Sequence, residues 1–362
     1  MRAEKVRHDR DWLSVTWEDG AETRHYAAWL RDNSPAPDAR DPVSGQRLFD
    51  IALLEGPVAL RGAWVEADGS IGMTLAPDGH QSRFDAALLR PADSSPTPNG
   101  AEAGLVETAW PALRDDPAAR LGWLAALAEQ GLALLTDLPG DPEAGAKVIA
   151  LFGYPRETNY GRSFSVVTKS EPNNLAFSDA ALGPHTDNPY RDPVPGLQLL
   201  HCLANEAGGG QSILVDGFAV AERLRSEAPE DFDLLSRHAV PFRFSDKAVT
   251  LTARQRVIAL DSAGALEAIH YNNRSAAAFD LPDDLLPDYY RAYRRFGTLL
   301  WEPDLQRRLT LRPGQLIAFD NRRLLHGRTA VKGAGARHLV GWYAERDGLR
   351  SAVAKLRDAL AA

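Results

Sequence analysis

The stretch Gly183-Pro-His-Thr-Asp-Asn-Pro-Tyr190 decides the predicted fold and chemistry, because it carries His185 and Asp187 with one residue between them. A third candidate ligand, His326, follows in Asp320-Asn-Arg-Arg-Leu-Leu-His-Gly-Arg328. Two imidazoles and one carboxylate hold non-haem Fe(II) on one face and leave the opposite face open. We therefore predict a catalytic iron site made by His185, Asp187 and His326.

A candidate cosubstrate anchor, Arg337, follows the third ligand in Arg337-His-Leu-Val-Gly-Trp-Tyr343. A fixed guanidinium can hold a carboxylate through two parallel hydrogen bonds. The alternative interpretations are a core histidine for His326 and a surface ion pair for Arg337. The order of ligand pair, long insertion, third ligand and arginine favours an oxidoreductase that uses Fe(II), 2-oxoglutarate and O2.

Composition and charge narrow the class of protein. Hydrophobic residues make up 44% of the chain and charged residues 25%, which is typical of a globular protein. The net charge of −8, without a basic stripe, argues against a nucleic-acid partner. Cys202 is the single cysteine, so no intramolecular disulfide can form. Neither a signal peptide nor a membrane-spanning run is recognisable, and we expect a cytoplasmic protein without a membrane partner.

The 362 residues predict one large and one small domain. The segment Pro91-Ala-Asp-Ser-Ser-Pro-Thr-Pro-Asn-Gly100 has the composition of a linker. We expect a small β-rich domain over residues 1–92, a linker over 93–104, and a catalytic domain over 105–362.

Hydrophobic periodicity predicts a mainly β protein with inserted helices. In the N-terminal part, strands are expected over 12–17, 24–30 and 70–75. Further on, the pattern predicts a helix over 116–130, a buried strand over 131–136, and helices over 220–237 and 283–301. His201 is expected to pack inside a buried strand. Strand-rich sequence with long insertions fits a double-stranded β-helix, or jelly roll, whose mouth can hold a metal.

Several collinear stretches resemble the γ-butyrobetaine hydroxylase and trimethyllysine hydroxylase group of 2-oxoglutarate oxygenases. The resemblance covers nearly the whole chain and implies a jelly-roll catalytic domain with a small N-terminal domain. The matching stretches are Trp29-Leu-Arg-Asp-Asn33, Asn173-Asn-Leu-Ala-Phe177, His185-Thr-Asp187, Pro195-Gly-Leu-Gln-Leu-Leu-His-Cys202, Gly209-Gly210, Val215-Asp-Gly-Phe218 and Phe319-Asp-Asn-Arg-Arg-Leu-Leu-His-Gly327.

The resemblance also implies a structural zinc, which family members commonly hold through cysteines after the Trp-Leu-Arg-Asp-Asn segment. Here that place reads Ser34-Pro-Ala-Pro-Asp-Ala39, without a cysteine. Zinc needs a closed set of thiolate, imidazole or carboxylate ligands. His80 alone cannot supply that set, so we expect no structural zinc.

The resemblance places cosubstrate and cation contacts on particular residues. Arg337 corresponds to the 2-oxoglutarate arginine, and Ser212 to a hydroxyl that helps hold the cosubstrate; a solvent-facing strand serine is the alternative. Family substrates carry a quaternary ammonium, which is best held over aromatic faces. The residues expected to form this cage are Tyr160, Phe164, Phe177 and Tyr343, with Tyr190 as a further candidate. Plain core packing is the alternative for Phe164 and Phe177.

The anionic end of the substrate separates the possible activities. Asn174 matches a family asparagine that contacts a carboxylate, while Asn188 and the segment Asn272-Asn-Arg274 depart from the family pattern. We place Asn273 and Arg274 in the substrate site, where a guanidinium suits a phosphonate better than a carboxylate. A surface ion pair is the alternative for Arg274. These features look like the trimethylaminoethylphosphonate hydroxylase branch.

The resulting prediction is hydroxylation of 2-(trimethylammonio)ethylphosphonate at the carbon next to phosphorus, by a homodimer that acts on small molecules. γ-Butyrobetaine hydroxylation is the nearest alternative. Trimethyllysine fits less well, because nothing obvious receives an α-ammonium group. A betaine-binding sensor without turnover is the alternative from another class.

Overall fold

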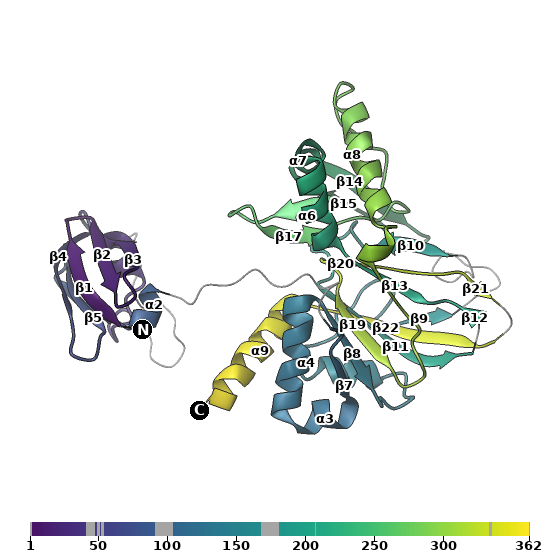
Figure 1. Ribbon diagram of the computed structural model, residues 1–362, viewed down its shortest axis with the longest axis horizontal. Helices are drawn as coiled ribbons and strands as arrows, with labels where there is room; N and C mark the ends of the chain where they lie inside the picture. The colour runs from purple at the N-terminus through teal and green to yellow at the C-terminus, as the bar shows by residue number, and fades with distance from the viewer. Residues whose placement is uncertain are drawn as a thin grey trace. The chain divides into compact units, whose positions relative to one another are not determined.

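The computed structural model describes residues 2–40, 48, 51, 54–90, 104–167, 181–206, 208–332 and 335–361 (Figure 1). The chain divides into two compact units, Met1–Pro96 and Thr97–Ala362. Residues 93–103 of the expected linker lie outside the described residues. Within the described part of the chain, no helix is long and apolar enough to cross a membrane.

The N-terminal unit consists mainly of two three-stranded antiparallel sheets. The first sheet contains β1 (Ala3–His8), β2 (Trp12–Trp17) and β3 (Glu22–Tyr26), and the second contains β4 (Ala59–Val65), β5 (Ile71–Ala76) and β6 (His80–Phe84). The alternation in β2 buries Leu13, Val15 and Trp17 in one core. A short helix, α2 (Ala86–Leu89), follows the second sheet.

The strand expected over residues 24–30 is only partly right. The strand β3 ends at Tyr26, and α1 (Ala27–Asp32) replaces the second half of the expected strand. Ala27 and Leu30 are both fully buried. Because they are three residues apart, a helix places both side chains on the face that meets the core.

The segment considered for a structural zinc takes part in a hydrogen-bond network. The buried Ser34 Oγ lies 2.8 Å from His80 Nε2 and 2.8 Å from Ser82 Oγ. Asp38 Oδ2 lies 3.3 Å from His80 Nδ1. One imidazole, one carboxylate and two hydroxyls do not make a closed zinc site. In the described residues of this unit, no three His, Cys, Asp or Glu side chains come close enough to share a metal ion.

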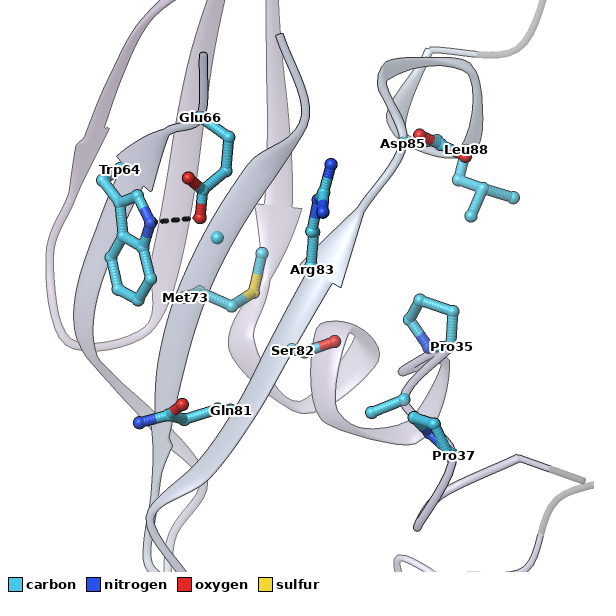
Figure 2. Close-up of a pocket in the computed structure, with 12 residues that line it drawn as sticks. Pro35, Pro37, Trp64, Glu66, Met73, Gln81, Ser82, Arg83, Asp85 and Leu88 are labelled. Atoms are coloured by element: carbon cyan, nitrogen blue, oxygen red, sulfur yellow. Dashed lines mark hydrogen bonds between the residues drawn. The ribbon is translucent and has the colours of Figure 1, made fainter. Parts of the chain in front are cut away.

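A surface pocket lies beside the same strands (Figure 2). Its wall includes Trp64, whose indole N–H donates to Glu66 Oε1 at 2.7 Å, together with Met73 and Arg83. Gly72 allows the indole of Trp64 to lie flat on the sheet, since a Cβ there would come within 2.5 Å of the ring. The pocket therefore mixes aromatic, apolar and charged groups.

The larger unit is built around a six-stranded and a four-stranded sheet (Figure 1). In order, the larger sheet contains β7 (Glu107–Ala109), β8 (Leu132–Thr136), β19 (Leu316–Asp320), β11 (Leu197–Asn205), β22 (Arg337–Ala344) and β9 (Phe164–Val167). The smaller sheet contains β10 (Leu182–His185), β20 (Leu324–Arg328), β13 (Ser212–Asp216) and β18 (Gln306–Leu309). Three two-stranded ribbons add β12 (Gly208–Gly209) with β21 (Val331–Lys332), β14 (Ala239–Ser245) with β15 (Thr250–Arg256), and β16 (Ile258–Leu260) with β17 (Leu266–Ile269).

The two main sheets face each other across a shared apolar core. Cys202 and Leu339 from the larger sheet pack in one cluster with Leu214 and Leu324 from the smaller sheet. This arrangement confirms the predicted jelly roll. It also means that alternate residues of β20 and β22 point into the space between the sheets.

Helices cover the outside of the larger sheet and one end of the barrel. The helices α4 (Pro117–Gln130), α5 (Ala144–Ile149) and α9 (Arg346–Ala361) supply apolar residues to the core on the outer face of the larger sheet. Figure 1 shows α4 and α9 side by side, and α3 (Trp110–Asp115) directly precedes α4. A separate core is formed around α6 (Gly217–Glu227), α7 (Pro229–Arg237) and α8 (Leu286–Leu299).

The single helix expected over residues 220–237 is wrong. The structure has two helices there, α6 and α7, with Ala228 in a non-helical conformation (φ −150°, ψ 74°) between them. Pro229 explains the break, because proline has no N–H to donate and restricts the residue before it. The expected helices over 116–130 and 283–301 are present with shorter bounds, as α4 and α8.

Candidate metal centre and substrate site

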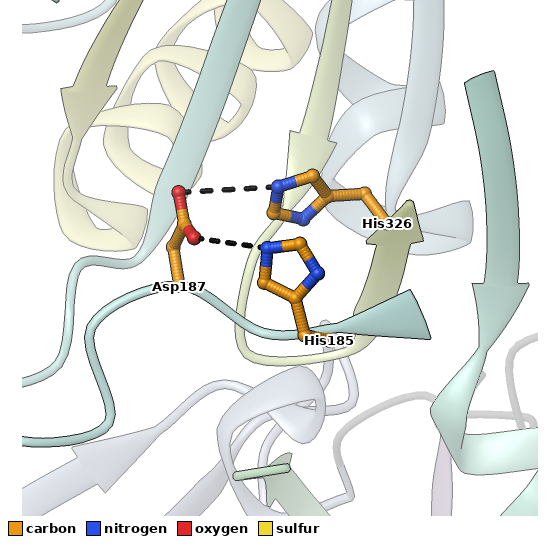
Figure 3. A group of neighbouring side chains, drawn as sticks. All are labelled: His185, Asp187 and His326. Atoms are coloured by element: carbon orange, nitrogen blue, oxygen red, sulfur yellow. Dashed lines mark ion pairs between the residues drawn. The ribbon is translucent and has the colours of Figure 1, made fainter. Parts of the chain in front are cut away.

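The three predicted ligands come together where β10 meets β20 (Figure 3). His185 pairs directly with His326 across these strands, and their ring centroids are 4.3 Å apart. Asp187 follows β10, with Oδ1 at 3.4 Å from His185 Nε2 and Oδ2 at 3.9 Å from His326 Nε2. Potential ligand atoms of all three residues lie within 4.8 Å of one another. Among the residues that the structure describes, no other group of this kind occurs.

Hydrogen bonds fix the orientation of His185 and Asp187. His185 Nδ1 lies 2.9 Å from the Gly183 carbonyl oxygen, which leaves Nε2 free for a metal. The backbone N–H of Asp187 donates to Asn321 Oδ1 at 2.7 Å, and Asn321 Nδ2 donates back to the Asp187 carbonyl at 3.0 Å. The Tyr343 hydroxyl donates to Asp187 Oδ2 at 2.7 Å. Asp187 is therefore held through both its backbone and its carboxylate.

Electrostatics keep His326 and Asp187 in the protonation states that a metal requires. Burial, together with the neighbouring His185 and Arg274 side chains, lowers the pKa of His326 to about 3, while Asp187 opposes the shift. Burial opposes ionisation of Asp187, but His326, His185 and the Tyr343 hydroxyl together lower its pKa well below the usual value. A neutral imidazole and an ionised carboxylate are the forms that bind metal. Two imidazoles and one carboxylate fit Fe(II), and His185, Asp187 and His326 would hold it.

The predicted cosubstrate residues lie on the two main sheets. Arg337 begins β22, and Ser212 begins β13. Gly210 provides space for the arginine, because a Cβ at that position would lie 3.1 Å from Arg337 Nε. The buried Nε has no hydrogen-bond partner among the described residues. A buried, positively charged donor of this kind fits a carboxylate ligand.

Four of the five predicted cage residues form a connected aromatic cluster. Phe164 lies between Tyr343 and Tyr160, with ring centroids 5.1 Å and 6.5 Å away. The hydroxyls of Tyr160 and Tyr190 are 3.1 Å apart. Gly341 makes room for the ring of Phe164, since a Cβ there would lie 2.4 Å from Cζ. Phe177, and also Asn174, lie outside the described residues.

Phe244 also belongs to the aromatic cluster, although the sequence analysis did not identify it. Its ring stacks on Tyr190 at 5.1 Å and meets Tyr160 edge-on at 5.9 Å. The residue sits on β14, in an alternating Phe-Arg-Phe stretch that predicts a strand. Only the folded arrangement shows that this strand reaches the cluster.

The residues predicted for the anionic end lie beside the metal ligands. The buried Asn188 directly follows Asp187 and has a left-handed backbone (φ 57°). Its Oδ1 accepts from the Tyr190 hydroxyl, while Nδ2 has no partner among the described residues. Arg274 is exposed, and no side-chain hydrogen bond or ion pair joins it to another described residue. Asn273, next to it, is also exposed.

Comparison with known families identifies the chain. Residues 93–343 match the family described as taurine catabolism dioxygenase TauD, TfdA family. The chain belongs to this dioxygenase family. Residues 4–90 match the γ-butyrobetaine hydroxylase-like N-terminal family. The predicted family, the dioxygenase class and the iron and 2-oxoglutarate cofactors are therefore confirmed at the level of the family.

Curated relatives of this dioxygenase span nearly its whole length. A protein of Pseudomonas sp. (strain AK-1), named gamma-butyrobetaine dioxygenase, is 36% identical over 95% of this chain and 94% of its own. The human protein of the same name is 30% identical over 96% and 94% of the two chains. A trimethyllysine dioxygenase of Meyerozyma guilliermondii is 27% identical over 95% and 93%.

Solved structures share the fold of this dioxygenase at low sequence identity. AAD-2, in complex with Mn(II) and N-oxalylglycine, has a TM-score of 0.52 at 14% identity over 67% of this chain and 92% of its own. An asparagine oxygenase has a TM-score of 0.50 at 17% identity over 64% and 80% of the two chains. What these structures share with this chain is the jelly-roll fold.

Proposed function

We propose that this dioxygenase hydroxylates 2-(trimethylammonio)ethylphosphonate at the carbon next to phosphorus. One oxygen atom of O2 enters the new hydroxyl group, and the other enters succinate as 2-oxoglutarate loses CO2. The names of the relatives, gamma-butyrobetaine dioxygenase and trimethyllysine dioxygenase, support a small quaternary ammonium substrate. The predicted homodimer is retained as a further proposal, which analytical ultracentrifugation tests.

The aromatic cluster suits the cationic end of this substrate. A quaternary ammonium cannot donate hydrogen bonds, so ring faces are its natural partners, at about 0.5–2 kcal/mol per contact. Tyr160, Phe164 and Tyr343 supply adjoining rings. The Tyr343 hydroxyl also touches Asp187, so this cluster reaches the metal centre itself.

The observation that carries the phosphonate proposal is the set of donors without protein partners beside the metal ligands. The guanidinium of Arg274 is close enough to His326 to lower the pKa of that imidazole. Asn188 adds a buried amide donor that has no partner among the described residues. A phosphonate offers three acceptor oxygens and up to two negative charges, so it can use a guanidinium and an amide together.

The protein residues have separable tasks in the proposed reaction. When bound, Fe(II) together with 2-oxoglutarate and O2 supplies the oxidising chemistry. Arg337 and Ser212 hold the cosubstrate, while the rings exclude water and hold the ammonium group. Arg274, Asn188 and Asn273 hold the phosphonate, so that one C–H bond faces the metal.

A side-by-side assay tests the proposal. The enzyme, loaded with Fe(II) and 2-oxoglutarate, is given the phosphonate or γ-butyrobetaine, and the hydroxylated product is quantified by NMR. Charge-assisted hydrogen bonds contribute about 1.5–3 kcal/mol each, so a preference of about tenfold or more for the phosphonate is expected. Higher catalytic efficiency with γ-butyrobetaine would instead assign the enzyme to the carboxylate substrate.

An arginine variant tests the role of Arg274 in the same assay. Arg274→Ala is expected to lower catalytic efficiency with the phosphonate and to narrow its advantage over γ-butyrobetaine. Arg294→Ala is the matched control, because it removes one exposed arginine from α8. Equal preferences in the wild type and in Arg274→Ala would exclude Arg274 as the phosphonate contact.

A further inference from the structure

Thr186, the residue between the first two ligands, joins the metal centre to the segment that carries Arg274. The backbone N–H of Thr186 donates to the Tyr271 carbonyl at 2.8 Å. In return, the backbone N–H of Tyr271 donates to Thr186 Oγ1 at 3.0 Å. Thr186 is fully buried, so both bonds are shielded from water.

Asn272 extends this link as far as Arg274. Its Nδ2 donates to the Thr186 carbonyl at 3.1 Å, and its Oδ1 accepts from the backbone N–H of Arg274 at 3.2 Å. The side chain is buried, with 6% of its surface exposed. One planar carboxamide therefore bridges the loop of the ligands and the residue that faces the substrate anion.

Packing from α8 holds the other side of the same segment. The ring of Tyr271 stacks on Tyr293, with centroids 4.9 Å apart, and lies 5.4 Å from Phe296. Gly297 leaves space for the Tyr271 hydroxyl, because a Cβ there would lie 2.5 Å from Oη. The segment is thus fixed between the helix and the metal loop.

We propose that Asn272 is a positioning residue that sets the place of Arg274 relative to His185 and Asp187, and so selects the substrate carbon that faces the metal. The inference rests on the proposed function, in which Arg274 holds the anionic end. The substrate is short, and its anion is tied to Arg274. A shift of Arg274 by the length of one carbon–carbon bond would therefore present a different carbon.

The chemistry of the bridge explains why an asparagine is needed. The link requires one donor, for the Thr186 carbonyl, and one acceptor, for the Arg274 N–H, on the same rigid group. A carboxamide offers both, whereas an ionised carboxylate offers only acceptors. Aspartate has nearly the same size and shape as asparagine but lacks the donor.

The test compares Asn272→Ala with the wild type and with Gln306→Ala. Gln306, on β18, is a matched control. Its half-buried carboxamide donates to the Leu300 carbonyl at 2.9 Å. Calorimetry measures phosphonate binding to protein loaded with Mn(II) and 2-oxoglutarate, together with the affinity for Mn(II) itself. The Fe(II) enzyme then gives the ratio of hydroxylated product to succinate, and NMR gives the position of the new hydroxyl.

Asn272→Ala is expected to bind the phosphonate about tenfold more weakly. It should also form succinate in excess over product, or hydroxylate a second carbon, while its Mn(II) affinity stays at the wild-type level. Gln306→Ala should match the wild type in every measurement. Asn272→Asp, which keeps the size and removes the donor, replaces the alanine variant if that protein does not fold.

Two outcomes overturn the inference. One is wild-type coupling, regiochemistry and phosphonate affinity in the Asn272 variants. The other is an equal loss of Mn(II) and phosphonate affinity, which would mean that Asn272 only supports the metal loop. If the wild type converts γ-butyrobetaine and not the phosphonate, the proposed substrate fails, and the same measurements on γ-butyrobetaine still decide the role of Asn272.

Discussion

Tyr343 shows, at the scale of single residues, how closely the substrate site and the metal centre are joined. Its ring belongs to the aromatic cluster with Phe164, and its hydroxyl donates to Asp187 Oδ2. The sequence analysis predicted a place for Tyr343 in the aromatic cage, but not its contact with Asp187. The second contact depends on where β22 lies relative to the H-x-D loop, which no local pattern encodes.

Tyr343→Phe separates the two contacts, because it keeps the ring and removes the hydroxyl. Outer partners of metal ligands contribute about 10–100-fold to metal affinity, so we expect a loss in this range for Fe(II). Binding of a trimethylammonium substrate should change little. Competition with a chelator measures the first quantity, and calorimetry with the Mn(II)-loaded protein measures the second. Wild-type Fe(II) affinity in this variant would show that the hydroxyl does not support Asp187.

Arg337 gives a second residue-level prediction. Losing one partner of a buried, charge-assisted pair costs about 2–5 kcal/mol, so Arg337→Ala should bind 2-oxoglutarate far more weakly. Betaine binding should be much less affected. Kinetics with each substrate varied in turn test this, with Arg294→Ala as the control for loss of an exposed arginine. An unchanged apparent affinity for 2-oxoglutarate would mean that another residue anchors the cosubstrate.

At the scale of elements, the sequence predicts well whatever is encoded locally. The alternation of β2 and the periodicity of α4 and α8 were visible directly. The break at Pro229 was also visible, but the apolar pattern on both sides led to one predicted helix. Asn321 contacts Asp187, and Phe244 contacts Tyr190, across long separations in the chain, so sequence alone could not place these contacts.

His201 on β11 yields a prediction about stability and pH. It is fully buried, and neither ring nitrogen has a hydrogen-bond partner among the described residues. Burial lowers its pKa from 6.5 to about 4, with the charge of Asp141 opposing the shift. The folded state therefore binds the proton less readily than the unfolded state. Its stabilising contribution is complete above the unfolded pKa of 6.5 and is lost as the pH falls towards 4.

Between about pH 7 and about pH 5, the free energy of unfolding should accordingly fall less for His201→Leu than for the wild type, by on the order of 1–3 kcal/mol. The melting temperature of the variant should fall less over the same range. Part of the wild-type pH dependence should remain, because burial also lowers the pKa of His270 to about 4. His8→Leu, at an exposed position, is the control. An equal fall of melting temperature with pH in His201→Leu and in the wild type would contradict the prediction.

At the scale of the whole molecule, we expect one Fe(II) per chain and no zinc. The candidate iron site lies in the larger unit, and in the N-terminal unit Ser34 Oγ lies within hydrogen-bond distance of His80 Nε2. Elemental analysis of protein purified without chelators measures both metals. Removing the iron should lower the melting temperature of the larger unit, because a ligand that binds only the folded state stabilises it. Stoichiometric zinc that survives this removal would contradict the second half of the prediction.

The pairing of His185 with His326 has a consequence for the order of events during synthesis. A chain leaving the ribosome presents His185 and Asp187 long before its third ligand exists. Gly327 then lets β20 approach β10 closely, since a Cβ there would lie 2.5 Å from the Leu182 carbonyl oxygen. Iron can consequently be captured by all three ligands only after the barrel has closed. The rate of metal uptake during refolding would therefore report the rate of barrel closure.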